Sequence, residues 1–325
     1  KKALITAQNT CFSLGLTTVD IAGLTKGSIE LIDRLHNSEE LKIKTYIMLT
    51  DNEENFNHYV INSNGPVKTK KMNVRSFKFF ADGSLGSRGA CLINPYLDNQ
   101  RTHGQLLQNI DTFNTKLNTL KLYGFQACTH AIGDSANRII TNSYANVLGG
   151  SNDLRWRIEH VQCISNKDIE IIGKYNIIPS VQPTHATSDF SWAIQRLGIK
   201  RLENCYRYYQ LKNQNNLIAL GTDFPVEKIN PIHTFYAATF RKNYDDKPLG
   251  GFQPNESLSR VDALKGMTIW AAIANFEENE KGSIEKGKAA DLTILNTDLI
   301  MCEENEILNT KVLYTIVDGE IVYEN

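Results

Sequence analysis

Apolar and polar positions along the chain follow two alternating rhythms. Short runs rich in β-branched and aromatic residues are typical of strands, and apolar residues spaced three and four positions apart are typical of helices. The pattern predicts seven strands, at Leu16–Ile21, Ile43–Leu49, Val74–Phe80, Gln126–His130, Trp156–Val161, Ile177–Val181 and Leu217–Gly221. It predicts helices around them, at Ala3–Leu14, Ile29–Leu35, Phe113–Tyr123, Ala136–Val147, Asn166–Lys174 and Trp192–Leu197. Strands that alternate with helices indicate a parallel sheet.

The number of predicted strands indicates an α/β barrel that is one strand short. Eight strands close a (β/α)8 barrel of the TIM type, and this pattern opens inside a helix. We therefore expect residues 1–280 to form strands 2 to 8 of such a barrel, with the first strand upstream of Lys1. The sequence begins without Met, which also leads us to expect a longer natural protein.

The last part of the chain has a different character. A predicted amphipathic helix at Leu258–Ala274 precedes a turn-rich stretch and short apolar runs at Leu292–Leu295, Val312–Val317 and Glu320–Tyr323. Asp318-Gly319, between two of these runs, is a strong signal for a β-hairpin. Residues 281–325 therefore predict a small β module, which is too short to fold alone and needs partner strands from elsewhere.

Composition narrows the classes of function. The 325 residues are 22% charged and 41% hydrophobic, with a net charge of −1, which is typical of an ordinary globular protein. The basic run 68–71 is too short to indicate nucleic-acid binding, and no stretch reaches the ~18–20 apolar residues of a membrane span. Six widely spaced cysteines predict buried thiols in a reducing compartment. We therefore predict a cytoplasmic protein and leave an exported form open.

Four of the predicted strands lead into residues that bind metals. These residues are Lys78, His130, His160 and Asp223. Side chains at the carboxyl ends of barrel strands point into the mouth of the active site, and neutral imidazoles together with a carboxylate suit Zn²⁺ or a similar divalent ion. Because side chains alternate along a strand, an inward His160 predicts an outward Glu159 and an inward Gln162.

Each of these candidates also has a purely structural interpretation. His130 is consistent with a polar residue near a helix start that Asp134 caps, and His160 with a core histidine whose hydrogen bonds are satisfied. Lys78, taken alone, is more often a surface lysine with a buried stem. What favours the metal interpretation is that several such residues occupy equivalent strand ends.

Six blocks of the sequence resemble the amidohydrolase superfamily. They read FKFFADGSLGSRGA, THAIGDSANR, RWRIEHVQ, PSVQPTHATSD, ALGTDFPVE and GSIEKGKAADLTIL, in the order of the family. The branch that they resemble contains metal-dependent hydrolases similar to N-substituted formamide deformylase. The resemblance implies a barrel with one or two divalent metals, Zn²⁺ first among them. It also implies a composite β-sandwich built from both chain ends, with residues 281–325 as its C-terminal part.

The resemblance assigns a role to each strand-end residue. His130 and His160 fall on the metal ligands of the fifth and sixth strands, and Asp223 on the eighth-strand aspartate that binds metal and shuttles a proton. Lys78 falls on the fourth-strand lysine, which is often carboxylated and then bridges two metals. That modification needs a neutral amine, so burial must lower the pKa of the lysine. The family's first strand normally supplies an HxH pair, which this sequence lacks and which we expect upstream.

The implied reaction is hydrolysis of an amide or other C–N bond, not a peptide bond, in a small-molecule substrate, with Asp223 as the general acid and base. We expect substrate contacts from Asp82, Arg88, Gln162 and His185. Asp82 and Arg88 have the alternative of bracing their loop, and His185 that of a polar turn. We expect no nucleic acid partner, and a homodimer is the assembly considered. Two other functions stay open: a single-metal deaminase of the same superfamily, and an inactive fragment that acts as a binding domain.

Overall fold

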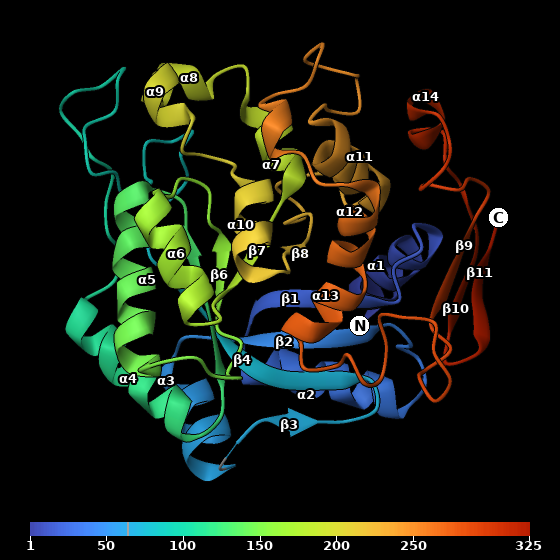
Figure 1. The fold of residues 1–325 in the computed structure, drawn as a ribbon. Helices are drawn as coiled ribbons and strands as arrows, with labels where there is room; N and C mark the ends of the chain where they lie inside the picture. Colours follow the sequence, from blue (N-terminus) through green and yellow to red (C-terminus); the bar gives the residue numbers. More distant parts are fainter. Residues whose placement is uncertain (64) are drawn as a thin grey trace.

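The computed structural model describes residues 1–63 and 65–325, and a curled sheet forms its centre (Figure 1). Within these residues the sheet follows the order β1-β2-β4-β5-β6-β7-β8, and every neighbouring pair on this path is parallel. The strands are β1 (Thr18–Leu24), β2 (Lys44–Thr50), β4 (Met72–Phe80), β5 (Gln126–Ala131), β6 (Arg157–His160), β7 (Ile178–Val181) and β8 (Ala219–Leu220). The short strand β3 (Val67–Lys68) pairs antiparallel with β4. The seven parallel strands predicted from the sequence are confirmed, and β3 was not predicted.

Helices separate the strands, as the alternating pattern predicts. Along the barrel they are α1 (Lys2–Ser13), α2 (Lys26–Asn37), α3 (Glu53–Asn55), α4 (Ile110–Leu122), α5 (Asp134–Leu148), α6 (Asn166–Lys174), α7 (Pro183–Asp189), α8 (Ala193–Leu197), α9 (Ile199–Leu202), α10 (Tyr208–Asn215) and α11 (Pro231–Phe240). A π-helical stretch, η1 (Phe56–Asn62), follows α3, and a 3-10 turn, η2 (Pro254–Glu256), follows α11. Figure 1 shows α4, α5 and α6 side by side along one flank of the sheet.

Local chemistry fixes several helix ends. The side chain of Asn109 accepts a hydrogen bond from the backbone N–H of Thr112 at the start of α4, and Ser165 does the same for Asp168 at the start of α6. Both bonds satisfy a donor that the first turn of a helix leaves free. Helix α5 ends at Gly149, whose φ of 76° lies in the left-handed region that glycine adopts at little cost.

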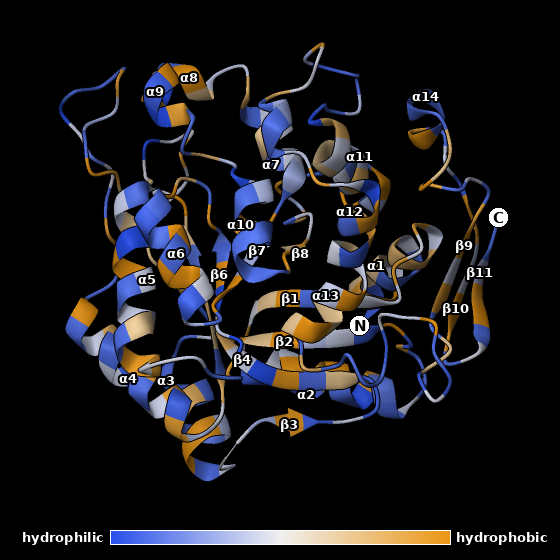
Figure 2. Ribbon diagram, in the orientation of Figure 1, coloured by the Kyte–Doolittle hydropathy of each residue, from blue (hydrophilic) through white to orange (hydrophobic). Residues whose placement is uncertain are grey.

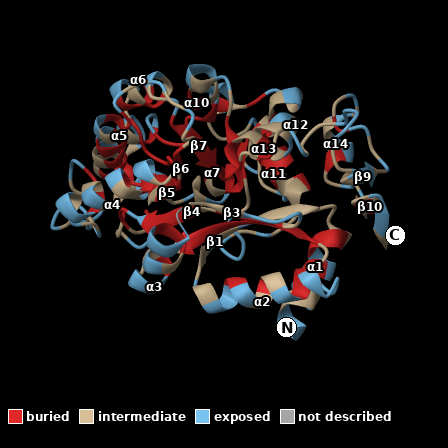
Figure 3. Cartoon of the chain, turned by 90° about the horizontal axis from the view of Figure 1, so that it is seen from below, coloured by how far each residue is buried: buried red, intermediate tan, exposed pale blue. Residues whose placement is uncertain are grey.

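The hydrophobic core lies between the sheet and the surrounding helices. Figure 2 shows both apolar and polar residues on α4, α5 and α6, and Figure 3 shows buried residues concentrated on the strands. Aromatic rings join the layers: Phe79 of β4 meets Phe113 of α4 at 5.3 Å between centroids, and Tyr144 of α5 meets Trp156 at 5.0 Å. Edge-to-face rings at such distances add to the area that they bury.

The inner side of the curled sheet is polar. Arg157 of β6 pairs with Asp20 of β1 at 2.8 Å, although β1 and β6 are far apart in the strand order. It also pairs with Glu159 at 2.8 Å. The hydroxyl of Tyr46 on β2 donates to the side chain of Gln126 on β5 at 2.8 Å. These bonds run across the interior, so they tie non-adjacent strands together and hold the curl of the sheet.

The C-terminal residues form a second, antiparallel sheet with the order β11-β10-β9. Its strands are β9 (Leu292–Leu295), β10 (Val312–Val317) and β11 (Glu320–Glu324), with α14 (Glu304–Ile307) between the first two. Asp318 and Gly319 have φ values of 51° and 84°, as a two-residue hairpin turn requires, so the predicted hairpin is confirmed. That this sheet belongs to a composite sandwich stays a prediction.

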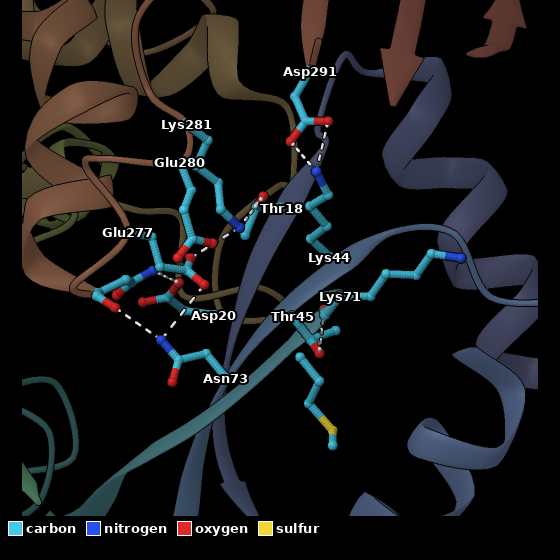
Figure 4. A network of polar contacts seen from close by, with 12 residues as sticks. Thr18, Asp20, Lys44, Thr45, Lys71, Asn73, Glu277, Glu280, Lys281 and Asp291 are labelled. Atoms are coloured by element: carbon cyan, nitrogen blue, oxygen red, sulfur yellow. Dashed lines mark hydrogen bonds and ion pairs between the residues drawn. The ribbon is translucent and has the colours of Figure 1, made fainter. Parts of the chain in front are cut away.

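The small sheet is tied to the barrel and to α1. The hydroxyl of Thr315 donates to the carbonyl of Phe12 at 2.6 Å. Lys44 of β2, with only 4% of its side chain exposed, pairs with Asp291 at 2.7 Å and with Asp318 at 2.8 Å. Figure 4 shows Lys44 reaching Asp291 beside the network around Asp20 and Glu277.

Two sequence predictions fail in detail. The single helix expected at Leu258–Ala274 is two helices, α12 (Arg260–Met267) and α13 (Ile269–Ala274), because Thr268 leaves the helical region with φ −126° and ψ −99°. The six cysteines are not all thiols, because Cys163 and Cys205 form a disulfide. Across the described part of the chain, no helix combines the length and the apolarity needed to cross a membrane.

Candidate active site

The carboxyl ends of β4, β5 and β6 bring three of the predicted residues to one edge of the sheet. In the parallel register Phe80 lies beside His130, and Ala131 beside His160, so the two histidines follow each other along this edge. Lys78 lies two residues before the end of β4. Parallel strands place such ends together because all of them point the same way.

Three imidazole rings form a row at this edge. The rings of His130 and His160 are 4.6 Å apart between centroids and meet edge to face, and the rings of His160 and His185 are 5.7 Å apart and nearly parallel. The amide oxygen of Gln182 lies 2.6 Å from Nδ1 of His160. Because that oxygen accepts hydrogen bonds, Nδ1 carries the proton and Nε2 keeps its lone pair.

Burial keeps these rings neutral. It lowers the pKa of His130 and of His185 to about 4, and in His130 the charge of Lys78 adds to the effect. Burial also lowers the pKa of His160 well below its ordinary value, with further contributions from His130 and Lys78. Within residues 1–63 and 65–325, the buried Nε2 atoms of His130 and His185 have no hydrogen-bond partner. Carboxylate oxygens face both atoms at longer range, Oδ1 of Asp82 at 3.5 Å from His130 and Oδ2 of Asp223 at 3.8 Å from His185. A neutral imidazole with a free ring nitrogen is the form that binds a metal.

Lys78 is buried among these groups, with 5% of its surface exposed. Burial lowers its pKa, and the nearby carboxylate of Glu159 offsets part of that effect. Its Nζ lies 4.5 Å from the ring centre of Phe80. A lowered pKa makes the neutral, nucleophilic form of a lysine amine easier to reach, and this is the form that carboxylation requires.

Asp223 approaches the row from the other side, just after β8. Its Oδ2 lies 3.8 Å from Nε2 of His185, and 38% of its side chain is exposed. Burial raises the pKa of Asp223, while the charge of Lys78 opposes that rise. Asp223 therefore reaches the imidazole row through His185, and in the described part of the chain no hydrogen bond or ion pair joins Asp223 to His130 or His160.

The side chains present fit a divalent cation in chemistry, and only partly in arrangement. Neutral imidazoles with free nitrogens, a carboxylate and a lysine of lowered pKa are suitable donors. In residues 1–63 and 65–325, however, no three His, Cys, Asp or Glu side chains are grouped closely enough to hold a metal ion. His130 and His160 provide a pair. The complete ligand set of Lys78, His130, His160 and Asp223 stays a prediction.

Asp82 binds backbone groups of its own loop and of the loop after β5, and Arg88 binds a carboxylate of its own loop. The carboxylate of Asp82 accepts hydrogen bonds from the backbone N–H groups of Cys91, Ile132 and Gly133 at 2.8–3.0 Å. Burial nevertheless raises the pKa of Asp82 to about 6. The guanidinium of Arg88 binds the carboxylate of Asp98 through two hydrogen bonds, at 2.9 and 3.1 Å. These contacts favour the bracing alternative for both residues over the alternative of a substrate contact.

Gln162 and His185 lie near the imidazole row, and their surroundings were not predicted. Gln162 donates to the hydroxyl of Tyr206 at 2.9 Å and to Asp189 at 3.3 Å. His185 belongs to α7, a helix that was not predicted from the sequence, where a polar turn was the structural alternative for this residue. The PTH motif gave a signal for this helix, because proline is common at the first helical position.

The expected outward direction of Glu159 is wrong. Glu159 is buried and pairs with Arg157 in the interior, while His160 next to it is also buried. The reason is the backbone: His160 has φ 75° and Val161 has φ 43°, so the strand ends in left-handed conformations and the alternation of side chains no longer holds. Asp223, at the end of β8, has φ 56°.

A curled parallel sheet flanked by helices, with a lysine, two histidines and an aspartate at or just after its strand ends, is the architecture of TIM-type α/β barrels. The chain belongs to the amidohydrolase family, whose model matches residues 1–323. It is 35% identical over 262 residues to Protein LONG AFTER FAR-RED 3 of Arabidopsis thaliana, and the matched region covers 80% of this chain and 44% of that protein. It is 28% identical over 207 residues to N-substituted formamide deformylase of Arthrobacter pascens, which covers 62% of this chain and 37% of that enzyme.

Solved structures agree with this assignment. An uncharacterized metal-dependent hydrolase from Pyrococcus furiosus superposes with a TM-score of 0.81 at 28% identity, over 91% of this chain and 59% of that one. A second, from Pyrococcus horikoshii, gives 0.83 at 25% identity, over 93% and 60%. The chain spans less than half the length of the two curated relatives described above.

Proposed function

We propose that the protein is a metal-dependent hydrolase that cleaves an amide or other C–N bond, not a peptide bond, in a small molecule. The observation that carries the proposal is the meeting of two neutral imidazoles at adjacent strand ends, buried His160 and largely buried His130, beside a buried lysine of lowered pKa. Core histidines and lysines without a function are normally satisfied by partners. Among the residues that the structure describes, the Nε2 atoms of His130 and His185 have no hydrogen-bond partner.

One or two divalent cations would be held by Lys78, His130, His160 and Asp223. Zn²⁺ is the first choice for imidazole and carboxylate donors. A cation there supplies Lewis-acid polarisation of the substrate carbonyl and makes a water molecule more acidic. The hydrogen bond from Nδ1 of His160 to Gln182 fixes the ring and its tautomer, which is the usual task of an outer partner of a metal ligand.

Asp223 is the proposed general acid and base. Burial raises the pKa of its carboxyl group, so it holds a proton more readily than an exposed aspartate does and is suited to pass one from water to a leaving nitrogen. His185 lies between Asp223 and His160, and within the described residues its Nε2 has no hydrogen-bond partner. This nitrogen can therefore donate a hydrogen bond to a substrate group or accept one from it. Gln162 is the other proposed substrate contact.

Metal analysis of the natural protein and of a Lys78→Ala variant tests the proposal. We expect purified protein reconstituted with Zn²⁺ to bind two ions per chain by mass spectrometry and to hydrolyse members of a panel of N-formyl and N-acyl amines. The Lys78→Ala variant should lose the two-ion site and most of the activity. Lys70→Ala is the matched control, because Lys70 has 74% of its side chain exposed and pairs with Asp318, far from the histidines.

Each other result selects another function. One ion per chain, with activity retained in Lys78→Ala, would favour the single-metal deaminase. If neither the natural protein nor the Lys78→Ala variant binds metal, the function that remains is that of a binding domain without catalysis. A Lys78→Ala variant that keeps two ions and full activity would refute the role given to Lys78.

A further inference from the structure

A polar cluster at the end of α7 is not used by the reaction as described so far. The carboxylate of Asp189, the last residue of α7, accepts a hydrogen bond from the hydroxyl of Tyr206 at 2.8 Å. The amide of Gln162 donates to the same carboxylate oxygen at 3.3 Å and to the hydroxyl of Tyr206 at 2.9 Å. The three side chains therefore form a closed triangle of hydrogen bonds, the Asp189 triangle, drawn from three separate segments.

The two segments that hold Asp189 are joined to each other covalently. Cys163 follows Gln162, Cys205 precedes Tyr206, and the two cysteines form a disulfide. Backbone hydrogen bonds run on both sides of this bridge: the N–H of Tyr206 donates to the carbonyl of Gln162 at 2.7 Å, and the N–H of Ile164 to that of Asn204 at 2.8 Å. Gln162 and Tyr206 thus have little freedom to move relative to each other.

Helix α7 transmits this restraint to the candidate active site. His185 and Asp189 are four residues apart on the helix, so they lie one above the other on the same face. His185 faces His160 on one side, at 5.7 Å between ring centres, and Asp223 on the other, at 3.8 Å. Fixing Asp189 therefore fixes the rotation of the helix and with it the position of His185.

The surroundings of Asp189 indicate that hydrogen bonds, rather than an ion pair, attach its carboxyl group to the neighbouring segments. The charged and titratable groups that face it are Tyr206, Tyr208 and Glu227, of which Glu227 is itself acidic and accepts a hydrogen bond from Ser188 at 2.6 Å. Burial, together with Glu227, raises the pKa of Asp189 to about 7. The hydrogen bonds from Tyr206 and Gln162 are thus its main attachment.

We propose that Asp189 is a positioning residue, which Tyr206 and Gln162 hold and the Cys163–Cys205 disulfide secures, and that it sets His185 against Asp223. The inference rests on the proposed hydrolytic function, and it adds to that function the part of the fold that orients the site. Asp189 acts through α7 and does not itself contact the reacting atoms. A neutral side chain with an accepting oxygen should therefore replace it.

Four variants test this proposal against simple loss of structure. Tyr206→Phe removes the hydroxyl that holds Asp189, and Tyr209→Phe is the matched control, since Tyr209 lies nearby with 47% of its surface exposed. Asp189→Asn keeps an oxygen that accepts the hydrogen bond of Tyr206, whereas Asp189→Ala removes it. We expect kcat to fall on the order of ten-fold or more in Tyr206→Phe and Asp189→Ala, because small displacements of a positioned group are costly. KM should change by about two-fold or less, and Asp189→Asn and Tyr209→Phe should keep most of the activity.

Hydrogen exchange of residues 183–189 gives a readout that does not need catalysis. Faster exchange in Tyr206→Phe and Asp189→Ala, but not in Asp189→Asn or Tyr209→Phe, is the expected result. Replacing both Cys163 and Cys205 by serine should also speed exchange there. This double variant keeps the proposal testable if Tyr206→Phe does not fold.

The outcomes separate this inference from the function on which it rests. Unchanged exchange and unchanged kcat in Asp189→Ala would overturn the positioning role, and so would an Asp189→Asn variant as inactive as Asp189→Ala. A natural protein that hydrolyses no member of the substrate panel would refute the proposed function. The exchange experiment would even then decide whether Asp189 fixes α7.

Discussion

Replacing Arg157 by leucine should destabilise the barrel more than any surface substitution does. Arg157 is 3% exposed and holds two carboxylates, Glu159 with 8% of its side chain exposed and Asp20 with 34%. It also donates to the side-chain oxygen of Asn275 at 3.0 Å. Leucine fills part of the space but leaves Glu159 as a buried charge without its hydrogen-bonded ion-pair partner.

The magnitude follows from these contacts. Breaking a buried ion pair by removing one partner costs about 3–5 kcal/mol, and this applies to Glu159. The pair with the more exposed Asp20 adds no more than ~1 kcal/mol, and the hydrogen bond to Asn275 about 1 kcal/mol. The expected loss of ~4–7 kcal/mol is a large part of the ~5–15 kcal/mol that stabilises a typical domain.

The loss of stability caused by Arg157→Leu depends on pH with a defined sign. Burial alone would raise the pKa of Glu159, but Arg157 and Lys78 outweigh it and hold the pKa below its ordinary value. In the natural protein Glu159 therefore adds stability above its unfolded pKa, and this is lost as the pH falls. In Arg157→Leu the folded pKa should rise above the unfolded one, so stability is lost as the pH rises. The deficit of the variant should grow from about pH 4 to about pH 7.

Urea unfolding at several pH values measures this effect, with Arg101→Leu, at an exposed loop position, as the control. Adding Glu159→Gln to Arg157→Leu should recover several kcal/mol, so the double-mutant cycle should be strongly non-additive. The reasoning is refuted if Arg157→Leu costs less than ~1 kcal/mol, the range of surface changes. It also fails if the two substitutions add within ~0.5 kcal/mol.

Two further predictions concern the junction of the sheets and the histidines. Lys44→Met should lower the free energy of unfolding in urea by about 3–5 kcal/mol, because Asp291, with 4% of its side chain exposed, loses its ion-pair partner. The control Lys42→Met, at a more exposed pair with Glu320, should cost no more than ~1 kcal/mol. Equal losses in the two variants would contradict this account. In metal-free protein, His130 and His185, with pKa lowered by burial to about 4, take up protons on unfolding, so thermal stability should fall as the pH drops from ~6.5 toward 4. A His185→Gln variant should show a weaker dependence on pH, and an unchanged dependence would contradict the assignment.

Local patterns were sufficient to predict the order of strands and helices. The strand Val74–Phe80 is rich in aromatic and β-branched residues, and β4 ends at the same residue. Asp318-Gly319 predicted its hairpin because only a few residue types tolerate positive φ at both central positions. The positions of Lys78, His130 and His160 near the ends of neighbouring strands were predicted in the same way, because the end of a strand is a local property and parallel strands share one edge. Their role as metal ligands stays a prediction.

What could not be predicted depends on contacts between distant segments. Asp189 and Tyr206 are 17 residues apart, and their hydrogen bond exists only because α7 lies near the segment between α9 and α10. The disulfide joins residues 42 positions apart without any motif. Thr268 interrupts a stretch that has a continuous helical pattern, so the helical period alone gave no sign of the break.

The backbone at the end of β6 argues that this edge is shaped for more than sheet stability. Val161 has φ 43°, and a β-branched residue in the left-handed region is a true outlier, because its side chain crowds the backbone there. Such conformations cost of order 1–3 kcal/mol each and persist only where the surroundings impose them. His160 is strained in the same way, and its ring is held by Gln182 at 2.6 Å. The left-handed conformation of these two successive residues breaks the regular alternation of side chains. It thereby allows Glu159 to lie near Lys78 while His160 lies beside His130.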